Sequence, residues 1–323
     1  MIISNEELKE YVFGALIKDT SDGMLRLSRF TKRQMELNTR RKLGAKNYSC
    51  VSMSIEFMTD ADEISFKWKR VPDSDILHLS FNVLTGGVIT DGFFKNHNND
   101  ECGECCFKLI GTGKRHVSIR LPNYSGVEIN DFYISGNVEK VVKNKKILVL
   151  GDSITQGAGS EYTALTYPNI IADRFGLDIL NQGIGGDVFC ADNLGEDIGF
   201  NPDYVTVAYG TNDWSGGRDV EKESGKYFQK LKALYPDSLI FDILPIWGFG
   251  ADDVNAKNKV GLTLDDVREL IKTTAEKYGI IVLNGKDYVP HLKECFYGDL
   301  HPSALGYTWY AESMIKDIIQ YLR

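Results

Sequence analysis

The sequence has 323 residues, of which 43% are hydrophobic and 25% charged, the balance of an ordinary soluble globular protein with room for two domains. Lysine and arginine total 37 against 45 aspartate and glutamate residues, so the formal net charge is −8, which disfavours nucleic acid and anionic membranes as partners. No segment approaches the roughly 20 apolar residues of a membrane helix, and the first ten residues lack the basic and apolar regions of a secretory signal, so we expect a cytoplasmic protein.

The first part of the chain has the sequence pattern of an antiparallel β-sandwich or jelly roll. Short segments that alternate polar and apolar residues, rich in β-branched and aromatic side chains, are separated by turns about every ten residues. The expected strands lie within 48–58, 61–71, 75–84, 86–94, 105–110, 115–121 and 127–136. Before them, residues 6–16 are expected to form one short helix, and the rest of the first 45 residues an entry strand and a loop.

Beyond a charged stretch at residues 139–146, strands and helices alternate. The expected strands are 146–152, 177–183, 203–210, 238–246 and 280–285, and the expected helices are 166–176, 220–236, 263–279 and 303–322. Five short apolar strands separated by helices predict a parallel sheet covered on both faces, a three-layer α/β/α domain. We therefore expect a β-sandwich domain at residues 1–140 and an α/β domain at residues 145–323.

Six cysteines in a chain of this length do not make a disulfide framework. Cys102, Cys105 and Cys106 are clustered but contain a single C-x-x-C pair, whereas a structural zinc site needs four ligands. Reduced thiols are the favoured interpretation, with Cys106 partly buried in a strand, and a metal site is the alternative.

Ligands of parallel sheets gather at the carboxyl ends of the strands, and the segment GDSITQG (151–157) follows the first strand there. A serine at a sharp strand exit, flanked by glycine, can present its hydroxyl above the sheet edge as a nucleophile. The segment is neither G-x-S-x-G nor a phosphate loop, since no Gly-Lys-Ser/Thr follows. A simple Asp-Ser helix cap is the alternative interpretation.

Two further segments end the next strands. In NQGIGGD (181–187), glycines let backbone N–H groups point into a cleft, and Val188 occupies the third glycine position of a dinucleotide-binding motif, which argues against that motif. In YGTND (209–213), Asn212 can donate an amide hydrogen to a developing oxyanion, although a loop asparagine often only closes a turn.

The segment GDLHPS (298–303) precedes the last helix and contains His301, one of five histidines, followed by Pro302. Alone, such a histidine is most often a solvated loop residue. Here serine, glycine, asparagine and histidine follow one another in chain order, each at the end of an expected strand or in a loop at one edge of the sheet.

These four segments resemble the sequence blocks of the SGNH (GDSL) hydrolase superfamily, over roughly residues 145–323. The resemblance implies an esterase in which Ser153 is the nucleophile and His301 the general base. It also implies an oxyanion hole formed by Ser153, Gly186 and Asn212, and a reaction that needs no cofactor and no metal.

The triad acid departs from the family pattern. The family places it three residues before the histidine, where this chain has Gly298, whereas Asp299 lies two residues before. Either Asp299 reaches the imidazole through a shortened loop, or a backbone carbonyl orients His301 and the site is a dyad; Glu294 and Asp287 are more remote candidates for the acid.

The residues near these four segments and the domain that precedes them indicate the class of substrate. Asp152, Trp214 and Trp247 are the expected substrate-binding residues, the two indoles as flat walls for a sugar ring, with aromatic loop packing as the alternative. A β-sandwich ahead of the catalytic domain resembles the two-domain carbohydrate esterases, which implies deacetylation of oligosaccharides or a small-molecule ester as substrate. An acyltransferase, a general short-chain (lipolytic or aryl) esterase and a non-catalytic carbohydrate-binding protein stay open, and the sequence does not indicate the oligomeric state.

Overall fold

The computed structural model describes residues 1–96, 99–196, 198–253 and 255–322. The chain forms two compact units: residues 1–144, 161–164 and 178–180 make up the first, and the rest of the chain makes up the second. We retain residues 1–140 and 145–323 as the proposed domain limits.

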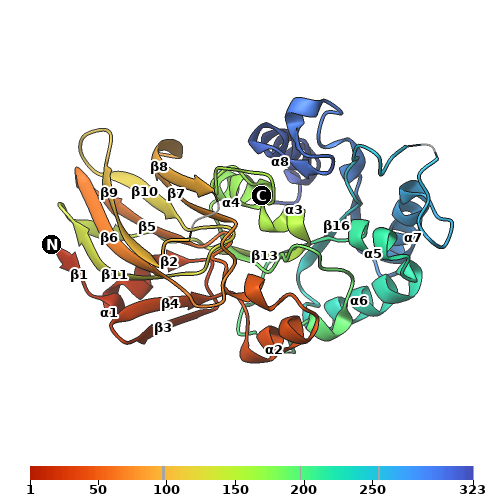
Figure 1. Cartoon of the computed structure of the whole chain (residues 1–323), viewed down its shortest axis with the longest axis horizontal. Helices are drawn as coiled ribbons and strands as arrows, with labels where there is room; N and C mark the ends of the chain where they lie inside the picture. Colours follow the sequence, from red (N-terminus) through yellow and green to blue (C-terminus); the bar gives the residue numbers. More distant parts are fainter. Residues whose placement is uncertain (97–98, 197, 254, 323) are drawn as a thin grey trace. The chain divides into compact units, whose positions relative to one another are not determined.

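The first unit is built from two antiparallel sheets (Figure 1). One has the order β3-β4-β11-β6-β9 with β1 paired to β11, and the other has the order β12-β5-β10-β7-β8 with β2 paired to β5. The strands are β1 (Ile2–Ile3), β2 (Val12–Phe13), β3 (Ile17–Ser21), β4 (Met24–Ser28), β5 (Ser54–Thr59), β6 (Glu63–Arg70), β7 (His78–Thr85), β8 (Val88–Asn96), β9 (Cys102–Lys108), β10 (Arg115–Arg120), β11 (Val127–Ile134) and β12 (Val138–Lys140). The predicted antiparallel β-domain is therefore confirmed.

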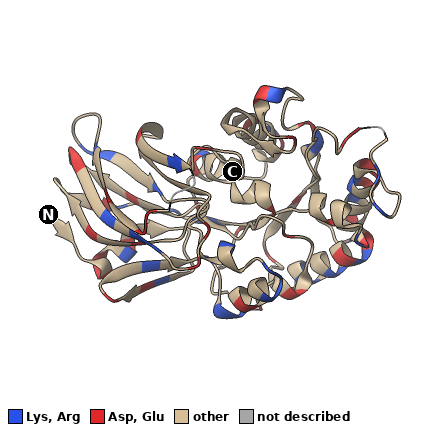
Figure 2. Ribbon diagram, in the orientation of Figure 1, with Lys and Arg blue, Asp and Glu red and all other residues tan. Residues whose placement is uncertain are grey.

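Aromatic side chains from both sheets form the centre of this unit. Phe66 of β6 stacks on Phe132 of β11 with ring centroids 5.9 Å apart, and meets Phe81 of β7 edge-on at 5.4 Å. These rings are fully buried, and each contributes about 1.5–3 kcal/mol through burial of apolar surface. In β6 the alternating pattern that predicted the strand corresponds to buried apolar residues on one face and more exposed, largely charged residues on the other, and Figure 2 shows the charged residues along the strands of this unit.

The N-terminal region differs from the prediction. The expected helix over residues 6–16 is a short α1 (Asn5–Leu8) and a 3₁₀ turn, because Val12 and Phe13 leave the helix to pair with β5. A further helix, α2 (Lys32–Arg40), was not expected. It begins at Thr31, whose side chain and that of Gln34 form a capping box, a signal present in the sequence but without a strong apolar stripe behind it.

The clustered cysteines lie along β9, and all six cysteines are free thiols. Cys105 is the buried member and Cys106 is exposed, so the prediction of a partly buried Cys106 is wrong by one residue. Successive side chains of a strand point to opposite faces, which separates these thiols. Over the described ranges, no group of three or more His, Cys, Asp or Glu side chains is arranged to hold a metal ion.

The second unit contains a five-stranded parallel sheet of order β14-β13-β15-β16-β17, as predicted. Its strands are β13 (Lys145–Gly151), β14 (Leu177–Asn181), β15 (Tyr204–Ala208), β16 (Leu239–Ile243) and β17 (Ile281–Leu283). The strand order reverses between β13 and β15, and at such a switch point the connections leave in opposite directions and open a crevice at the carboxyl ends of the strands.

Helices cover both faces of this sheet, with α4 packed on α8 and α6 packed on α7 (Figure 1). The helices are α3 (Ser153–Gln156), α4 (Tyr167–Phe175), α5 (Thr211–Gly216), α6 (Val220–Leu234), α7 (Leu264–Lys277) and α8 (Ala304–Ile318). A two-stranded hairpin of β18 (Phe296–Tyr297) and β19 (His301–Pro302) precedes α8. In the part of the chain that the structure describes, no helix combines the length and apolar character that a bilayer crossing requires.

Candidate active site

The turn between β13 and α3 carries Ser153. Asp152 caps α3 by accepting a hydrogen bond from the Ile154 N–H at 3.0 Å, and Ser153 begins the helix with a half-buried side chain. A Cβ on Gly151 would lie 2.1 Å from the Thr155 hydroxyl and 2.8 Å from the Ala208 carbonyl oxygen. Glycine is therefore required for the chain to turn this sharply against β15.

Tyr307 of α8 fixes the far side of this turn. Its fully buried hydroxyl lies 2.9 Å from the Ile154 carbonyl oxygen and 2.8 Å from the Ala158 carbonyl oxygen. The last turn of α3 is thereby tied to the C-terminal helix, which restricts the position of the serine.

The NQGIGGD segment is bound to the same turn by buried amide side chains. Asn181 donates to the Thr155 carbonyl oxygen at 2.9 Å, and the Gln156 side chain accepts from the Gly185 N–H at 2.7 Å. The Asp187 N–H closes a turn onto the Ile184 carbonyl oxygen, with Gly186 at a φ of 86°, a value that glycine adopts without strain. Gly186 is exposed, so its backbone is open to a ligand.

Asn212 lies in the first turn of α5, after β15. Its amide nitrogen donates to the Asp187 carbonyl oxygen at 2.9 Å and lies 3.4 Å from a carboxylate oxygen of Asp152. The first bond uses one of the two amide hydrogens, and the second contact is too long to hold the other hydrogen firmly. The Asn212 amide therefore lies beside the glycine turn with its two hydrogens on Asp187 and Asp152, and the bond to Asp152 is the weaker one.

His301 reaches the same point from β19. Its Nε2 lies 2.9 Å from the Ser153 hydroxyl oxygen, hydrogen-bond distance between a histidine and a serine 148 residues apart in sequence. Burial lowers the pKa of His301 below its ordinary value, so the neutral ring that can accept the serine proton predominates at neutral pH.

Asp299 lies on the turn between β18 and β19 with an exposed side chain. Between the described residues no hydrogen bond or ion pair joins it to His301, and the same holds for a backbone carbonyl and Nδ1 of the ring. The structure therefore brings Ser153 and His301 together and leaves Asp299 outside the contact.

Asp152 is also placed differently from the expectation of a substrate contact. It is 5% exposed, and its two carboxyl oxygens face the Ile154 N–H and the Asn212 amide. Burial, with additional repulsion from the nearby Asp187 and Asp213 carboxylates, raises the pKa of Asp152 to about 7. Both of its oxygens are therefore occupied by contacts within the protein.

The two tryptophans are held by protein contacts. The half-buried Trp214 donates its indole N–H to the Leu262 carbonyl oxygen at 2.9 Å. Trp247 stacks on His291 with centroids 4.2 Å apart and meets Phe249 and Phe296 edge-on. One face of Trp247 is therefore covered, which favours the packing interpretation for this residue.

Tyr297 is a neighbour of the site that the sequence interpretation missed. It is the cross-strand partner of His301 in the β18–β19 hairpin and is 63% exposed. A Cβ on Gly159 would lie 3.1 Å from the Cβ atoms of both Tyr297 and His301, so glycine allows this hairpin to approach the chain that follows α3. The hairpin is only two residues per strand, too short for a sequence signal.

The family of the chain follows from this geometry together with a sequence match. A family model described as the GDSL-like lipase/acylhydrolase family matches residues 149–309, which contain Ser153, Gly186, Asn212 and His301. The chain belongs to this family. It is accordingly an enzyme of the carboxylic ester hydrolase class. No curated protein matches the chain in sequence.

Solved structures share the fold over nearly the whole chain. A salicylyl-acyltransferase from a tetracycline biosynthetic pathway is 18% identical, with a TM-score of 0.78 over 96% of this chain and 94% of that one. A putative GDSL-like lipase from Bacteroides ovatus is 18% identical, with a TM-score of 0.76 and coverages of 100% and 98%. An acetyl xylan esterase from the rumen bacterium Butyrivibrio proteoclasticus is 13% identical, with a TM-score of 0.66 and coverages of 100% and 99%. At these identities the similarity establishes the two-part fold and not the substrate.

Proposed function

We propose that this enzyme is a serine esterase that removes acetyl groups from oligosaccharides through a Ser153–His301 pair. The observation that carries the proposal is the 2.9 Å contact between His301 Nε2 and the Ser153 hydroxyl oxygen at the switch point of the sheet. A neutral imidazole in that position can take the serine proton as the hydroxyl attacks an ester carbonyl.

The proposed reaction has two halves. Ser153 forms a bond to the carbonyl carbon, His301 accepts the hydroxyl proton, and the tetrahedral intermediate collapses when His301 returns that proton to the leaving sugar oxygen. A water molecule then attacks the acetyl-serine, gives its proton to His301, and releases acetate as Ser153 regains a proton. His301 is thus base and acid in turn.

The oxyanion of both intermediates is proposed to be held by the backbone N–H groups of Ser153 and Gly186 and by the Asn212 amide. Gly186 supports this role because it is exposed, and Asn212 because its second amide hydrogen makes only a long contact of 3.4 Å with Asp152, which an oxyanion can replace. Each donor of this kind typically lowers the barrier by about 2.7–4 kcal/mol.

We assign Asp152 a positioning role in place of a substrate contact. It caps the nucleophile turn, and its raised pKa of about 7 means that it carries less negative charge at neutral pH than an ordinary aspartate. A full charge 3.4 Å from the Asn212 amide would oppose the negative oxyanion, so partial protonation is favourable to catalysis.

Two observations support a sugar as the leaving group. Tyr297, exposed beside His301, is the aromatic side chain best situated to contact the leaving group, and the acetyl xylan esterase shares the fold. The test is acetate release from acetylated xylo-oligosaccharides by the wild type and by Ser153→Ala. Acetate release that is lost in Ser153→Ala supports the proposal. Activity on p-nitrophenyl acetate without activity on acetylated sugars would limit it to a short-chain esterase.

An acyltransferase on the same site is the second candidate, favoured by the fold similarity to a salicylyl-acyltransferase. In that reaction an alcohol replaces water in the second half. Incubation with an acyl donor and a sugar acceptor, followed by mass spectrometry, distinguishes the two: an acylated sugar indicates transfer, and free acid alone indicates hydrolysis.

A further inference from the structure

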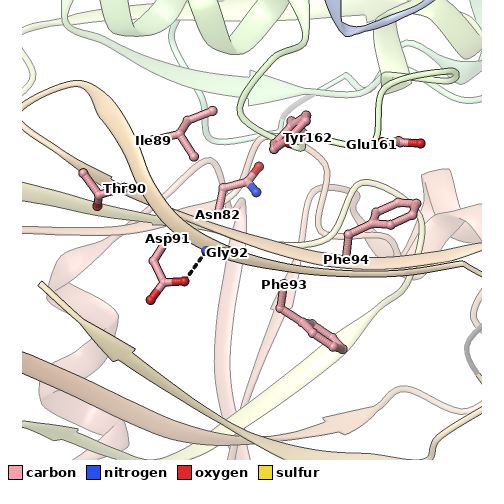
Figure 3. Close-up of a pocket in the computed structure, with 9 residues that line it drawn as sticks. All are labelled: Asn82, Ile89, Thr90, Asp91, Gly92, Phe93, Phe94, Glu161 and Tyr162. Atoms are coloured by element: carbon pink, nitrogen blue, oxygen red, sulfur yellow. Dashed lines mark hydrogen bonds between the residues drawn. The ribbon is translucent and has the colours of Figure 1, made fainter.

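The first unit has a hollow of about 340 Å³ on strand β8 (Figure 3). Strand β8 is the last strand of its sheet, and the segment 161–164, which belongs to the same unit, supplies the other wall. The volume is at the lower end of the range for small-molecule sites.

Two aromatic rings form the walls. Phe94 of β8 is 39% exposed although its ring centroid lies 5.4 Å from that of His78, and Tyr162 on the facing segment is 45% exposed. Figure 3 shows both rings on the same side of β8 as the Asn82 side chain, whereas Phe93 and Asp91 point to the opposite side. This agrees with the alternation of a strand, since Gly92 pairs with Asn82 across β7 and β8.

The wall that contains Tyr162 is fixed rather than loose. Buried Thr163 lies with its hydroxyl oxygen 2.8 Å from the Leu121 carbonyl oxygen, and the Ala164 N–H donates to the Asn82 side-chain oxygen at 3.0 Å. These bonds anchor the two residues that follow Tyr162 and so restrict the position of its exposed ring beside the hollow.

The floor between the rings is polar and buried. Asn82 is 3% exposed, and its amide nitrogen donates one hydrogen to the Phe81 carbonyl oxygen at 3.1 Å, which leaves a second hydrogen for a ligand among the described contacts. A Cβ on Gly92 would lie 2.9 Å from this nitrogen, so the glycine keeps the amide uncovered.

The charged side chains that line the hollow limit the charge of a ligand that it can bind. The described lining residues include Asp91 and Glu161 and no basic side chain, which disfavours an anion. Only Glu161 extends from the wall on the side of the rings, and it is exposed and therefore screened by water, which gives a cation little attraction. Flat apolar walls with an amide and a carboxylate match a neutral ring with an apolar face and hydroxyl groups at its edge.

We propose that this hollow is a second binding site, in the β-sandwich unit, for one or two rings of a neutral pyranose oligosaccharide. Phe94 and Tyr162 contact the faces of the sugar, Asn82 donates to a hydroxyl oxygen, and Glu161 accepts from a hydroxyl group. The site does not depend on ester cleavage, so an unacetylated sugar is a sufficient ligand.

The test is isothermal titration calorimetry of the full chain with unacetylated xylohexaose and cellohexaose. We expect the wild type to bind one of them, and Phe94→Ala and Tyr162→Ala each to weaken binding about tenfold, the loss of one aromatic contact. Trp309→Ala is the matched control, because Trp309 is a 47% exposed ring in the second unit, and it should leave binding unchanged. Both hollow variants truncate exposed rings, and their melting temperatures should equal that of the wild type.

Hydrolysis of p-nitrophenyl acetate separates this proposal from the esterase proposal, since all three variants should retain it. Absence of binding to both hexasaccharides would overturn the sugar site, as would binding that survives both Phe94→Ala and Tyr162→Ala. Saturable binding of tetramethylammonium at this site in place of the sugars would also overturn it. None of these results affects the assignment of Ser153.

Discussion

Asp242 gives the sharpest test of the packing in the second unit. It lies in β16, between Val207 of β15 and Val282 of β17 in the sheet register, and it is fully buried. In the ranges that the structure describes, neither of its carboxyl oxygens has a hydrogen-bond partner. Burial therefore raises the pKa of Asp242 well above its ordinary value, because the charged form would lose hydration without compensation.

The sign of the pH effect follows from this raised pKa. Above pH ~3.9 the unfolded chain releases the Asp242 proton while the folded chain keeps it, so the folded state binds more protons and loses stability as pH rises. The loss is about 1.4 kcal/mol per pH unit until the folded pKa is reached. Asp242→Asn cannot ionise, so its free energy of unfolding should exceed that of the wild type by a margin that grows with pH at this slope.

The measurement is urea unfolding between pH 4.5 and 6.5, followed by tryptophan fluorescence. Three of the four tryptophans (Trp214, Trp247 and Trp309) lie in the second unit and report on it. The 1.4 kcal/mol lost per pH unit corresponds to a shift of about 3–6 °C in melting temperature for a domain of this size. Asp237→Asn, a change at an exposed carboxylate near the start of β16, is the control and should follow the wild type. Parallel pH curves for the wild type and Asp242→Asn would refute the reasoning.

Three further predictions concern the site. Asn212→Ala should lower kcat about 10²–10³-fold with little change in KM, as measured by initial rates on p-nitrophenyl acetate, because its amide is proposed to stabilise charge that exists only in the transition state; a pure KM effect would contradict this. For the wild type, kcat/KM should rise with pH through the pKa of His301, which is held below its ordinary value. Asp299→Asn should lower kcat/KM tenfold or less without moving this rise, since no contact joins the two residues in the described structure. A steep loss of kcat/KM together with a shifted pH profile would restore Asp299 as the triad acid. Tyr307→Phe should destabilise the fold by about 1–3 kcal/mol in urea unfolding, because the carbonyl oxygens of Ile154 and Ala158 share its single hydroxyl hydrogen and would lose it; equal stability would show that water replaces the hydroxyl.

The sequence was most informative where local pattern and topology agree. The apolar strands and the amphipathic helices predicted the parallel sheet, and segments at the ends of its strands brought Ser153 and Asn212 to one edge because parallel strands end together. The close contact with His301 needed more than this rule, since it depends on a hairpin of two residues per strand and on the packing of Gly159.

Some predicted site residues are not in contact with Ser153 or His301, because their surroundings depend on geometry that sequence spacing does not show. Trp247 is covered by His291, 44 positions later, and nothing in the sequence around either residue indicates the stack. Asp299 is two residues from His301, yet the turn between β18 and β19 leaves its side chain exposed, and the direction of a side chain in a tight turn is not encoded in spacing. The predicted helix over residues 6–16 ended early because pairing of Val12 with β5 outweighed local helix propensity.

The central claim, that Ser153 is the nucleophile, is tested most directly by trapping the acyl-enzyme. The full chain is mixed with p-nitrophenyl acetate, quenched with acid within the first turnover, digested and analysed by mass spectrometry. We predict one added acetyl group on the peptide that contains Ser153, and none on the corresponding peptide of Ser153→Ala. Turnover of the ester by Ser153→Ala at a rate near that of the wild type, or an acetyl group on another residue whose removal abolishes activity, would contradict the assignment.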